Sequence, residues 1–453
     1  MKIIIAGCGK IGSSLVEALV SEGHDVTIID NSPAVITEIT NIYDVMGICG
    51  NCVDSDILDE AGISDVDLFI AVANTDELNM LSCFLARKRG AKHTIARIRT
   101  PEYNDKSLGF MKHELELSLS INPEQLAAHE LFNILKFPSA IKIESFTRRY
   151  LEMIEVPLKE NSFLDGVMLK DIRSTFNAKV LVCCILRGDE VFIPKGDFVL
   201  KSGDRIGITA NHTEFQKLFK HSGHFQKQVK DVMILGGGRV SYYLAQMLTN
   251  TGLSVKIIEK DEKVCEAISE LLPKATVILG DGAQQELLIE EGLLKTDAFV
   301  SLTGMDEQNI LISIFAASQN VPKVIAKVNR DELGGMAEKL GLDTVVSPKK
   351  IVADQIIRYA RALQNSLGSN IETMYKCMDG KAEALEFNVV KDARLTNIPL
   401  KELKIRKDIL IGGIIRDRKT IIPGGDDVIL EGDKVIVIAA NQRLQDLADI
   451  LEK

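Results

Sequence analysis

The chain carries one sequence pattern twice, and this duplication limits its possible folds more than any other feature. The glycine-rich stretch G-C-G-K-I-G at residues 7–12 follows an apolar run, and G-G-G-R-V-S at residues 236–241 follows another. A second apolar run ends at the acidic residue Asp30 in the first half and at Glu259 in the second half. The repeat therefore predicts two halves built on one plan.

In each half, the pattern of apolar residues changes in the same way along the sequence. Short apolar runs alternate with helix-period segments from residue 2 to about 135, and this alternation predicts a parallel sheet covered by helices on both faces. A β-rich stretch follows, and its closing pattern P-x-G-D … G-D at 194–204 returns at 423–433. The sequence thus predicts an α/β protein with two tandem Rossmann-type, doubly wound parallel sheets, each followed by a small α+β domain.

The points where the sequence pattern changes also suggest boundaries for these units. We expect a first nucleotide-binding domain, a first appendage, a polar linker, a second nucleotide-binding domain and a second appendage. In that order they cover residues 1–138, 139–222, 223–229, 230–368 and 369–453.

Composition excludes several classes of protein. The net charge of −10 and the lack of a basic stripe argue against nucleic-acid binding. Apolar runs such as 180–186 are far shorter than the roughly 20 residues that a membrane-spanning helix needs. Without a secretory signal at its start, the chain is expected in the cytoplasm, where its eight cysteines act as small apolar residues. The C-x-x-C at 49–52 lacks a second half-site, so no metal site is expected.

The first glycine-rich loop has the full context of a dinucleotide-binding motif. Gly7, Gly9 and Gly12 follow a strand and open a helix, and Asp30 ends the next strand. In this motif the first glycine makes a tight turn, the second lets a pyrophosphate approach, and the third permits close helix packing. Asp30 would then bind the ribose hydroxyls and repel a 2′-phosphate, which favours NAD(H) or an adenine nucleotide over NADP. In the alternative interpretation, Asp30 only caps the next helix.

The second loop departs from this motif. Ser241 replaces the third glycine, and Glu259 replaces the aspartate, although a glutamate still suits a ribose. The second site is therefore either degenerate or selective for another nucleotide. Lys10 and Arg239 hold the same position in the two loops and either contact a phosphate or lie in solvent.

Further polar residues follow the later strands of each half. Asn74 and Thr75 come just after the fourth strand, where ligands bind in a doubly wound sheet, although Thr75 is equally suited to cap a helix. Asp54 and Asp281 follow the third strands, near the expected adenine position. Arg97 and Arg99 lie near the end of the fifth strand and either meet phosphates, contact a neighbouring subunit or are surface charges.

The stretches after the nucleotide domains separate binding from catalysis. A dehydrogenase needs a substrate domain with an acid or base, whereas here short β-rich appendages follow. The sequence favours a nucleotide-binding regulatory protein that is not an enzyme. An NAD-dependent oxidoreductase acting on a small molecule, and a free-standing nucleotide sensor, remain as alternatives.

Over essentially its whole length the chain resembles the TrkA family, regulatory proteins of Trk potassium-uptake systems with tandem KTN/RCK domains. The resemblance rests on the first loop with Asp30, on residues 50–62, on A-N-T-D-E-x-N at 73–79, and on the two P-x-G-D … G-D patterns. It implies RCK_N and RCK_C domains, binding of NAD(H) or ATP/ADP, and a homo-oligomer, either a dimer or a tetrameric ring. It also implies control of an integral-membrane potassium-translocating subunit of the TrkH or TrkG kind, on the inner face of the plasma membrane.

The resemblance also implies a set of nucleotide-binding residues. In the first half these are Gly7, Cys8, Gly9, Lys10, Ile11, Gly12, Asp30, Asp54, Ala73, Asn74, Thr75 and Arg97. The second-half candidates are Gly236, Gly238, Arg239, Val240, Glu259 and Asp281, and the altered loop puts this second site in question.

Overall fold

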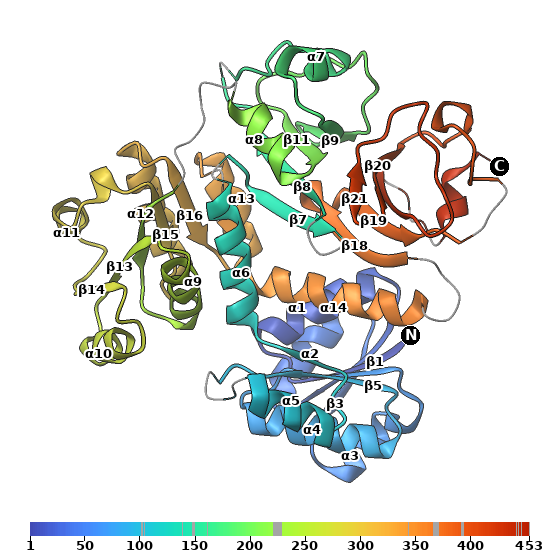
Figure 1. The fold of residues 1–453 in the computed structure, drawn as a ribbon. Helices are drawn as coiled ribbons and strands as arrows, with labels where there is room; N and C mark the ends of the chain where they lie inside the picture. The colour runs from blue at the N-terminus through green and yellow to red at the C-terminus, as the bar shows by residue number, and fades with distance from the viewer. Residues whose placement is uncertain are drawn as a thin grey trace.

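The computed structural model contains two six-stranded parallel sheets and two five-stranded antiparallel sheets (Figure 1). It describes all residues except 101–102, 104, 138, 147–149, 161, 221–228, 343, 366–370, 391–393, 441, 443, 445 and 453. The parallel sheets share one strand order, β3-β2-β1-β4-β5-β6 and β14-β13-β12-β15-β16-β17. The predicted fold class, two Rossmann-type sheets each followed by a small α+β unit, is confirmed.

The first Rossmann unit follows the apolar runs of the sequence. Its strands are β1 (Lys2–Ala6), β2 (Asp25–Asp30), β3 (Met46–Cys49), β4 (Leu68–Ala71), β5 (His93–Arg97) and β6 (Leu119–Ile121). The helices are α1 (Lys10–Ser21), α2 (Pro33–Ile42), α3 (Ser55–Glu60), α4 (Asp76–Arg89), α5 (Asp105–Glu114) and α6 (Pro123–Lys136). Ser32 caps α2, and Pro33 lies in its first turn, where a proline loses no helical hydrogen bond.

The second Rossmann unit repeats this arrangement. Its strands are β12 (Asp231–Leu235), β13 (Ser254–Glu259), β14 (Thr276–Leu279), β15 (Ala298–Ser301), β16 (Lys323–Lys327) and β17 (Val345–Val346). The helices are α9 (Arg239–Asn250), α10 (Glu262–Leu271), α11 (Gln285–Glu290), α12 (Asp306–Ser318), α13 (Asp331–Lys339) and α14 (Pro348–Asn365).

The two C-terminal units share a second plan. The first holds β7 (Lys142–Phe146), β8 (Leu151–Pro157), α7 (Ile172–Phe176), β9 (Leu181–Arg187), β10 (Glu190–Phe192), β11 (Arg205–Ala210) and α8 (His212–Lys220). The second holds β18 (Ile371–Cys377), β19 (Ala382–Asn388), β20 (Ile409–Arg416), β21 (Lys419–Ile421) and β22 (Lys434–Ala440).

A buried ion pair explains the repeated closing motif of these units. The Asp204 carboxylate accepts hydrogen bonds from Nε and Nη2 of Arg187, at 2.7 and 2.8 Å. Asp433 accepts the same two bonds from Arg416, at 2.8 and 2.7 Å. Both aspartates are buried, so each bidentate pair fixes the end of its motif against the sheet.

The last helix of each Rossmann unit packs against the opposite unit. Helix α6 lies against α9, and its residues Ala127, Ala128 and Leu131 share a core with the second sheet. Helix α14 lies along α1, as Figure 1 shows. The two helices also contact each other, so they tie the Rossmann units together at their crossing.

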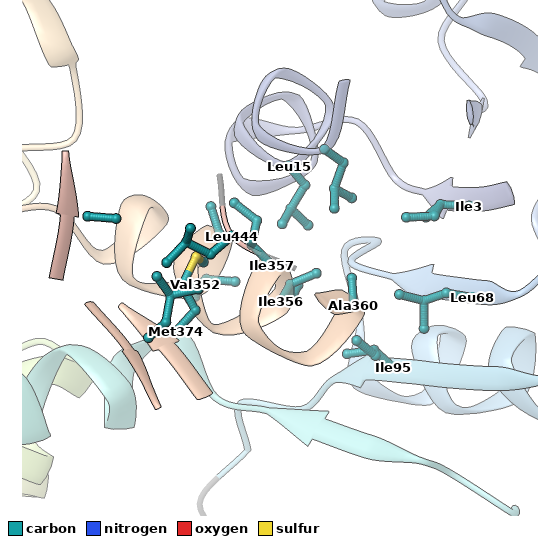
Figure 2. Close-up of a cluster of buried hydrophobic side chains, with 14 of the residues drawn as sticks. Ile3, Leu15, Leu68, Ile95, Val352, Ile356, Ile357, Ala360, Met374 and Leu444 are labelled. Carbon is teal, nitrogen blue, oxygen red and sulfur yellow. The ribbon is translucent and has the colours of Figure 1, made fainter. Parts of the chain in front are cut away.

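Helix α14 further joins the first Rossmann unit to the second C-terminal unit. Leu15 of α1 and Ile356 of α14 belong to one hydrophobic core, which continues to Met374 in the second C-terminal sheet (Figure 2). The second C-terminal sheet packs through another core against the first C-terminal sheet. The second C-terminal unit is therefore anchored to both α14 and the first C-terminal unit.

Two predictions fall partly outside the described part of the chain. Residues 223–228 of the predicted linker are not described, and neither are residues 221–222 at the end of the first appendage or the proposed boundary residues 138 and 368–369. The division into domains stays a prediction. Among the described helices, none combines the length and apolar character that crossing a bilayer requires.

Candidate nucleotide-binding cleft

The first glycine-rich loop has the backbone that its sequence predicts. Gly7 adopts φ of 93°, and a Cβ there would lie 2.6 Å from the Ala73 backbone nitrogen. A Cβ on Gly12 would lie 2.0 Å from the Gly7 carbonyl oxygen. Around Gly9, by contrast, no described atom lies within 4 Å of a Cβ position. Two glycines thus serve the turn and the helix contact, while Gly9 leaves open space above the loop.

Asp30 holds this loop in place. Its Oδ2 accepts the backbone N–H of Cys8 at 2.7 Å, and its Oδ1 accepts that of Ser32 at 2.9 Å. The carboxylate therefore joins the glycine-rich loop to the end of β2. Each carboxylate oxygen has a further lone pair, so these bonds leave Asp30 able to accept a ribose hydroxyl.

Both glycine-rich loops face one cleft between the two Rossmann units. The cleft has a volume of about 1150 Å³ and is lined by residues of both halves. Gly9 is the N-cap of α1 and Gly238 is the N-cap of α9, and among the described residues no side chain caps either helix. Two helix N-termini, each with unpaired N–H groups and a partial positive charge, therefore open into one space.

Most of the first-half candidates line this cleft, and fewer of the second-half candidates do. The lining includes Gly7, Gly9, Lys10, Ile11, Asp30, Ala73, Asn74, Arg97, Gly238, Arg239 and Val240. The candidates outside the lining are Cys8, Gly12, Asp54, Thr75, Gly236, Glu259 and Asp281. Contact between any of these residues and a nucleotide stays a prediction.

Several candidates outside the lining bond to local backbone. Thr75 Oγ1 accepts the N–H of Leu78 at 3.3 Å and caps α4. Asp54 caps α3 by accepting the N–H of Asp56 at 2.9 Å. Asp281 accepts the N–H of Ala283 at 3.0 Å. These short polar side chains satisfy turn and helix-end donors, which is their common structural role.

The second loop differs where its sequence differs. Ser241 is fully buried in place of the third glycine, and its hydroxyl has no hydrogen-bond partner among the described residues. Both carboxylate oxygens of Glu259 accept backbone N–H groups, from Gly237 at 2.5 Å and from Lys260 at 2.8 Å. Since Glu259 lies outside the cleft lining whereas Asp30 is part of it, the two halves present unequal surfaces to the cleft.

The walls of the cleft carry partly buried cations. Burial lowers the pKa of Arg97, and the charges of Arg99 and Arg239 add to this shift. Burial likewise lowers the pKa of Lys327, to which the charge of Lys10 contributes. Arg97 and Lys327 end equivalent strands, β5 and β16. An anion between these cations would stabilise their charged forms, and the lining also holds carboxylates such as Glu124 and Asp306.

Sequence reasoning missed part of this lining. Lys327 and Asn329 were not selected, although they hold the positions that Arg97 and Arg99 hold in the first half. The internal repeat could have identified them, because it aligns residues 327 and 329 with residues 97 and 99. Asn31 and Asn51, which follow β2 and β3, also line the cleft. They carry no motif of their own, so only their position at the carboxyl edge of the sheet pointed to them.

Comparison with protein families follows the same division of the chain. The TrkA-N domain family matches residues 3–110 and 232–348. The TrkA-C domain family matches residues 153–223 and 384–452. Each family therefore matches once in each half.

Individual relatives match along the full length. The Trk system potassium uptake protein TrkA homolog of Archaeoglobus fulgidus is 33% identical over 451 residues, covering 99% of this chain and 100% of that protein. TrkA homolog 1 of Methanosarcina mazei is 31% identical over 451 residues and covers 97% of each chain. Among solved structures, the GsuK channel bound to NAD superposes with a TM-score of 0.62 at 16% identity, covering 97% of this chain and 77% of that one. At that identity the likeness concerns the fold.

Proposed function

The chain belongs to the TrkA family of potassium-uptake proteins, and on that premise we propose that it is a nucleotide-binding regulatory subunit of a Trk-type potassium-uptake system. It binds NAD(H), or alternatively ATP or ADP, and controls the conformation of a membrane subunit of the TrkH or TrkG kind. It acts from the cytoplasmic face of the plasma membrane through that partner and is not itself an enzyme. The observation that carries the proposal is the cleft into which both glycine-rich loops open.

The two halves contribute differently to the proposed site. Asp30, Asn31 and Asn51 line the cleft beside the first loop, whereas Glu259 and Asp281 lie outside it. The adenosine therefore binds to the first Rossmann unit, with its ribose on Asp30. The phosphates lie between the N-termini of α1 and α9, near Lys10, Arg97, Arg239 and Lys327. This arrangement uses one ligand to bridge two units.

A ligand of this kind supports gating because it binds between parts that can move. A nucleotide shifts a conformational equilibrium only as far as it binds one arrangement better than the other. In a cleft walled by two units, phosphate contacts to both walls depend on the angle between those units. Typical couplings of this kind amount to about 1–3 kcal/mol.

The proposed oligomer is supported by two similar apolar faces. Leu81 on α4 and Leu311 on α12 hold equivalent positions, with relative exposures of 48% and 65%. Phe110 on α5 and Met336 on α13 are also exposed. Because each chain carries two such faces in different places, it can contact two neighbours, as ring closure requires.

An NAD-dependent oxidoreductase is the second candidate, since the first loop suits NAD(H). We favour the regulator because the wall of the cleft opposite the first loop is a second Rossmann unit, whereas an oxidoreductase would need a substrate domain there. Potassium flux through a reconstituted complex, measured with NADH, NAD⁺, ATP and ADP in turn, tests the choice. The regulator predicts nucleotide-dependent flux, and flux that ignores all four nucleotides would contradict it. A substrate-dependent change in NADH absorbance would favour the oxidoreductase.

A further inference from the structure

Helix α1 connects the proposed nucleotide site to a distant part of the molecule. Its first turn contributes Lys10 and Ile11 to the cleft lining, and it ends at Ser21 with Glu22 as C-cap. Figure 1 shows α14 lying along α1, with the second C-terminal sheet beyond it. Because α1 is one continuous helix packed on α14, a displacement of its N-terminus is transmitted to its C-terminus.

Glu22 takes part in a buried ionic cluster at that far end. Its Oε2 accepts a hydrogen bond from Arg361 Nε of α14 at 2.9 Å, and its Oε1 lies 3.1 Å from Lys376 Nζ of β18. Arg361 also donates to both carboxylate oxygens of Glu383 in β19, at 3.2 and 3.1 Å. Only 5% of the Glu22 side chain is exposed, so solvent screens this cluster weakly. Four charges thus join α1 and α14 to two strands of the second C-terminal sheet.

At the position equivalent to Glu22, the second half carries no acidic side chain. Thr251 takes the place of Glu22 as C-cap of α9, and its hydroxyl donates to the Met247 and Leu248 carbonyls of its own helix. Lys136 of α6 takes the place of Arg361, counted from Pro123 and Pro348. A threonine cannot form the ion pair that Glu22 forms. The duplication therefore kept the helix and changed its far end.

We infer that the Glu22–Arg361 pair, held by Lys376 and Glu383, couples the nucleotide cleft to the second C-terminal unit. The inference rests on the proposed nucleotide-binding function and states which part of the molecule responds to the nucleotide. The first glycine-rich loop signals through α1 to β18 and β19, whereas the helix after the second loop lacks an equivalent of Glu22. Arg361 and Glu22 act as positioning residues, since neither lines the cleft.

Hydrogen exchange of the full chain tests this path with ADP and NADH as probes. In the wild type, saturating nucleotide should change amide exchange in 371–377 and 382–388 by roughly fivefold or more. In Arg361→Gln the nucleotide should still bind, and that change should fall to less than about twofold. Persistence of the full change in Arg361→Gln would overturn the inference.

A second variant and a control keep the outcome interpretable. Glu22→Gln preserves the shape of the side chain while removing its charge, so it should reduce the same response. It serves as the test if Arg361→Gln fails to fold. Lys136→Gln, at the equivalent place in the other half, should leave the response at its wild-type size. If calorimetry shows nucleotide binding but β18 and β19 do not respond in the wild type, the inference alone fails. If no nucleotide binds the wild type, the proposed function fails with it.

Discussion

Arg97 belongs to the first Rossmann unit and Arg239 to the second, yet both line one cleft, and the Arg239 charge adds to the effects of burial and of Arg99 in lowering the pKa of Arg97. Two cations from different units therefore repel each other across the space that both helix N-termini face. An anion between them would remove this repulsion.

Arg239→Ala should weaken the binding of ADP while leaving that of adenosine unchanged. Loss of a hydrogen bond to a charged group costs about 1.5–3 kcal/mol, which is roughly a 10- to 150-fold loss of affinity. Arg239→Lys keeps the charge and should recover part of the loss. Isothermal titration calorimetry with both ligands measures the difference. An equal loss for adenosine and ADP would place Arg239 away from the phosphates.

Lys327 should take up a proton when a nucleotide binds at a pH near or above the lowered pKa of this lysine, and the measurement is made at such a pH. Burial lowers its pKa below the ordinary lysine value of 10.5, and a phosphate nearby would raise that pKa again. Affinity for ADP should therefore decrease as pH rises through the lowered pKa of the unliganded protein. Calorimetry in buffers of different ionisation enthalpy should detect proton uptake in the wild type and less in Lys327→Met. Identical proton uptake in both proteins would contradict this role.

The repeated ion pair of the C-terminal units should matter for stability. Asp433 is buried and accepts bonds from Arg416 and from the backbone of Leu430, so Asp433→Ala should cost about 2–3 kcal/mol. Asp426, in the same motif, pairs with Lys401 but is 89% exposed. Asp426→Ala should therefore cost less than about 0.5 kcal/mol. Urea denaturation followed by circular dichroism compares the two, and equal costs would refute this explanation.

The apolar faces should control assembly. A charge at Leu311, which is 65% exposed on α12, should reduce the oligomer to a smaller species in Leu311→Asp. Val390 is 55% exposed on the second C-terminal unit, so Val390→Asp is a control that should keep the wild-type mass. Light scattering coupled to size-exclusion chromatography measures both. An unchanged mass for Leu311→Asp would remove α12 from the interface.

The strands and the glycine-rich turn were predicted well because residues close in the sequence determine them. The apolar runs predicted the strands, and the loop glycines predicted the turn in which Gly7 has positive φ. Asp54 and Asp281 were selected as adenine neighbours, which stays a prediction, and in the structure they bond to backbone N–H groups two residues on. Short aspartate side chains favour such local donors, and no motif indicates which choice wins.

The sequence did not predict that α6 packs on the second Rossmann unit and α14 on the first. An amphipathic helix shows that it buries one face, but its pattern does not say against which unit. Leu131 and Ile356 are apolar whether they pack on their own sheet or on the other one. The cleft depends on this packing, because α6 and α14 each contact the opposite Rossmann unit and so hold the two units together. Aligning the two halves would have selected Lys327 as the counterpart of Arg97, but its place in the same cleft as the first loop appears only in the folded chain.

Calorimetric titration of Gly9→Ala and Gly238→Ala with ADP and NADH tests the central claim most directly. Both glycines have negative φ, and around each no described atom lies within 4 Å of a Cβ position, so neither substitution should disturb the fold. Our account predicts that the methyl group of Gly9→Ala obstructs the diphosphate and weakens binding at least about tenfold, or 1.4 kcal/mol, with a smaller loss for Gly238→Ala. Wild-type affinity in Gly9→Ala, or a larger loss in Gly238→Ala, would contradict nucleotide binding on the first loop.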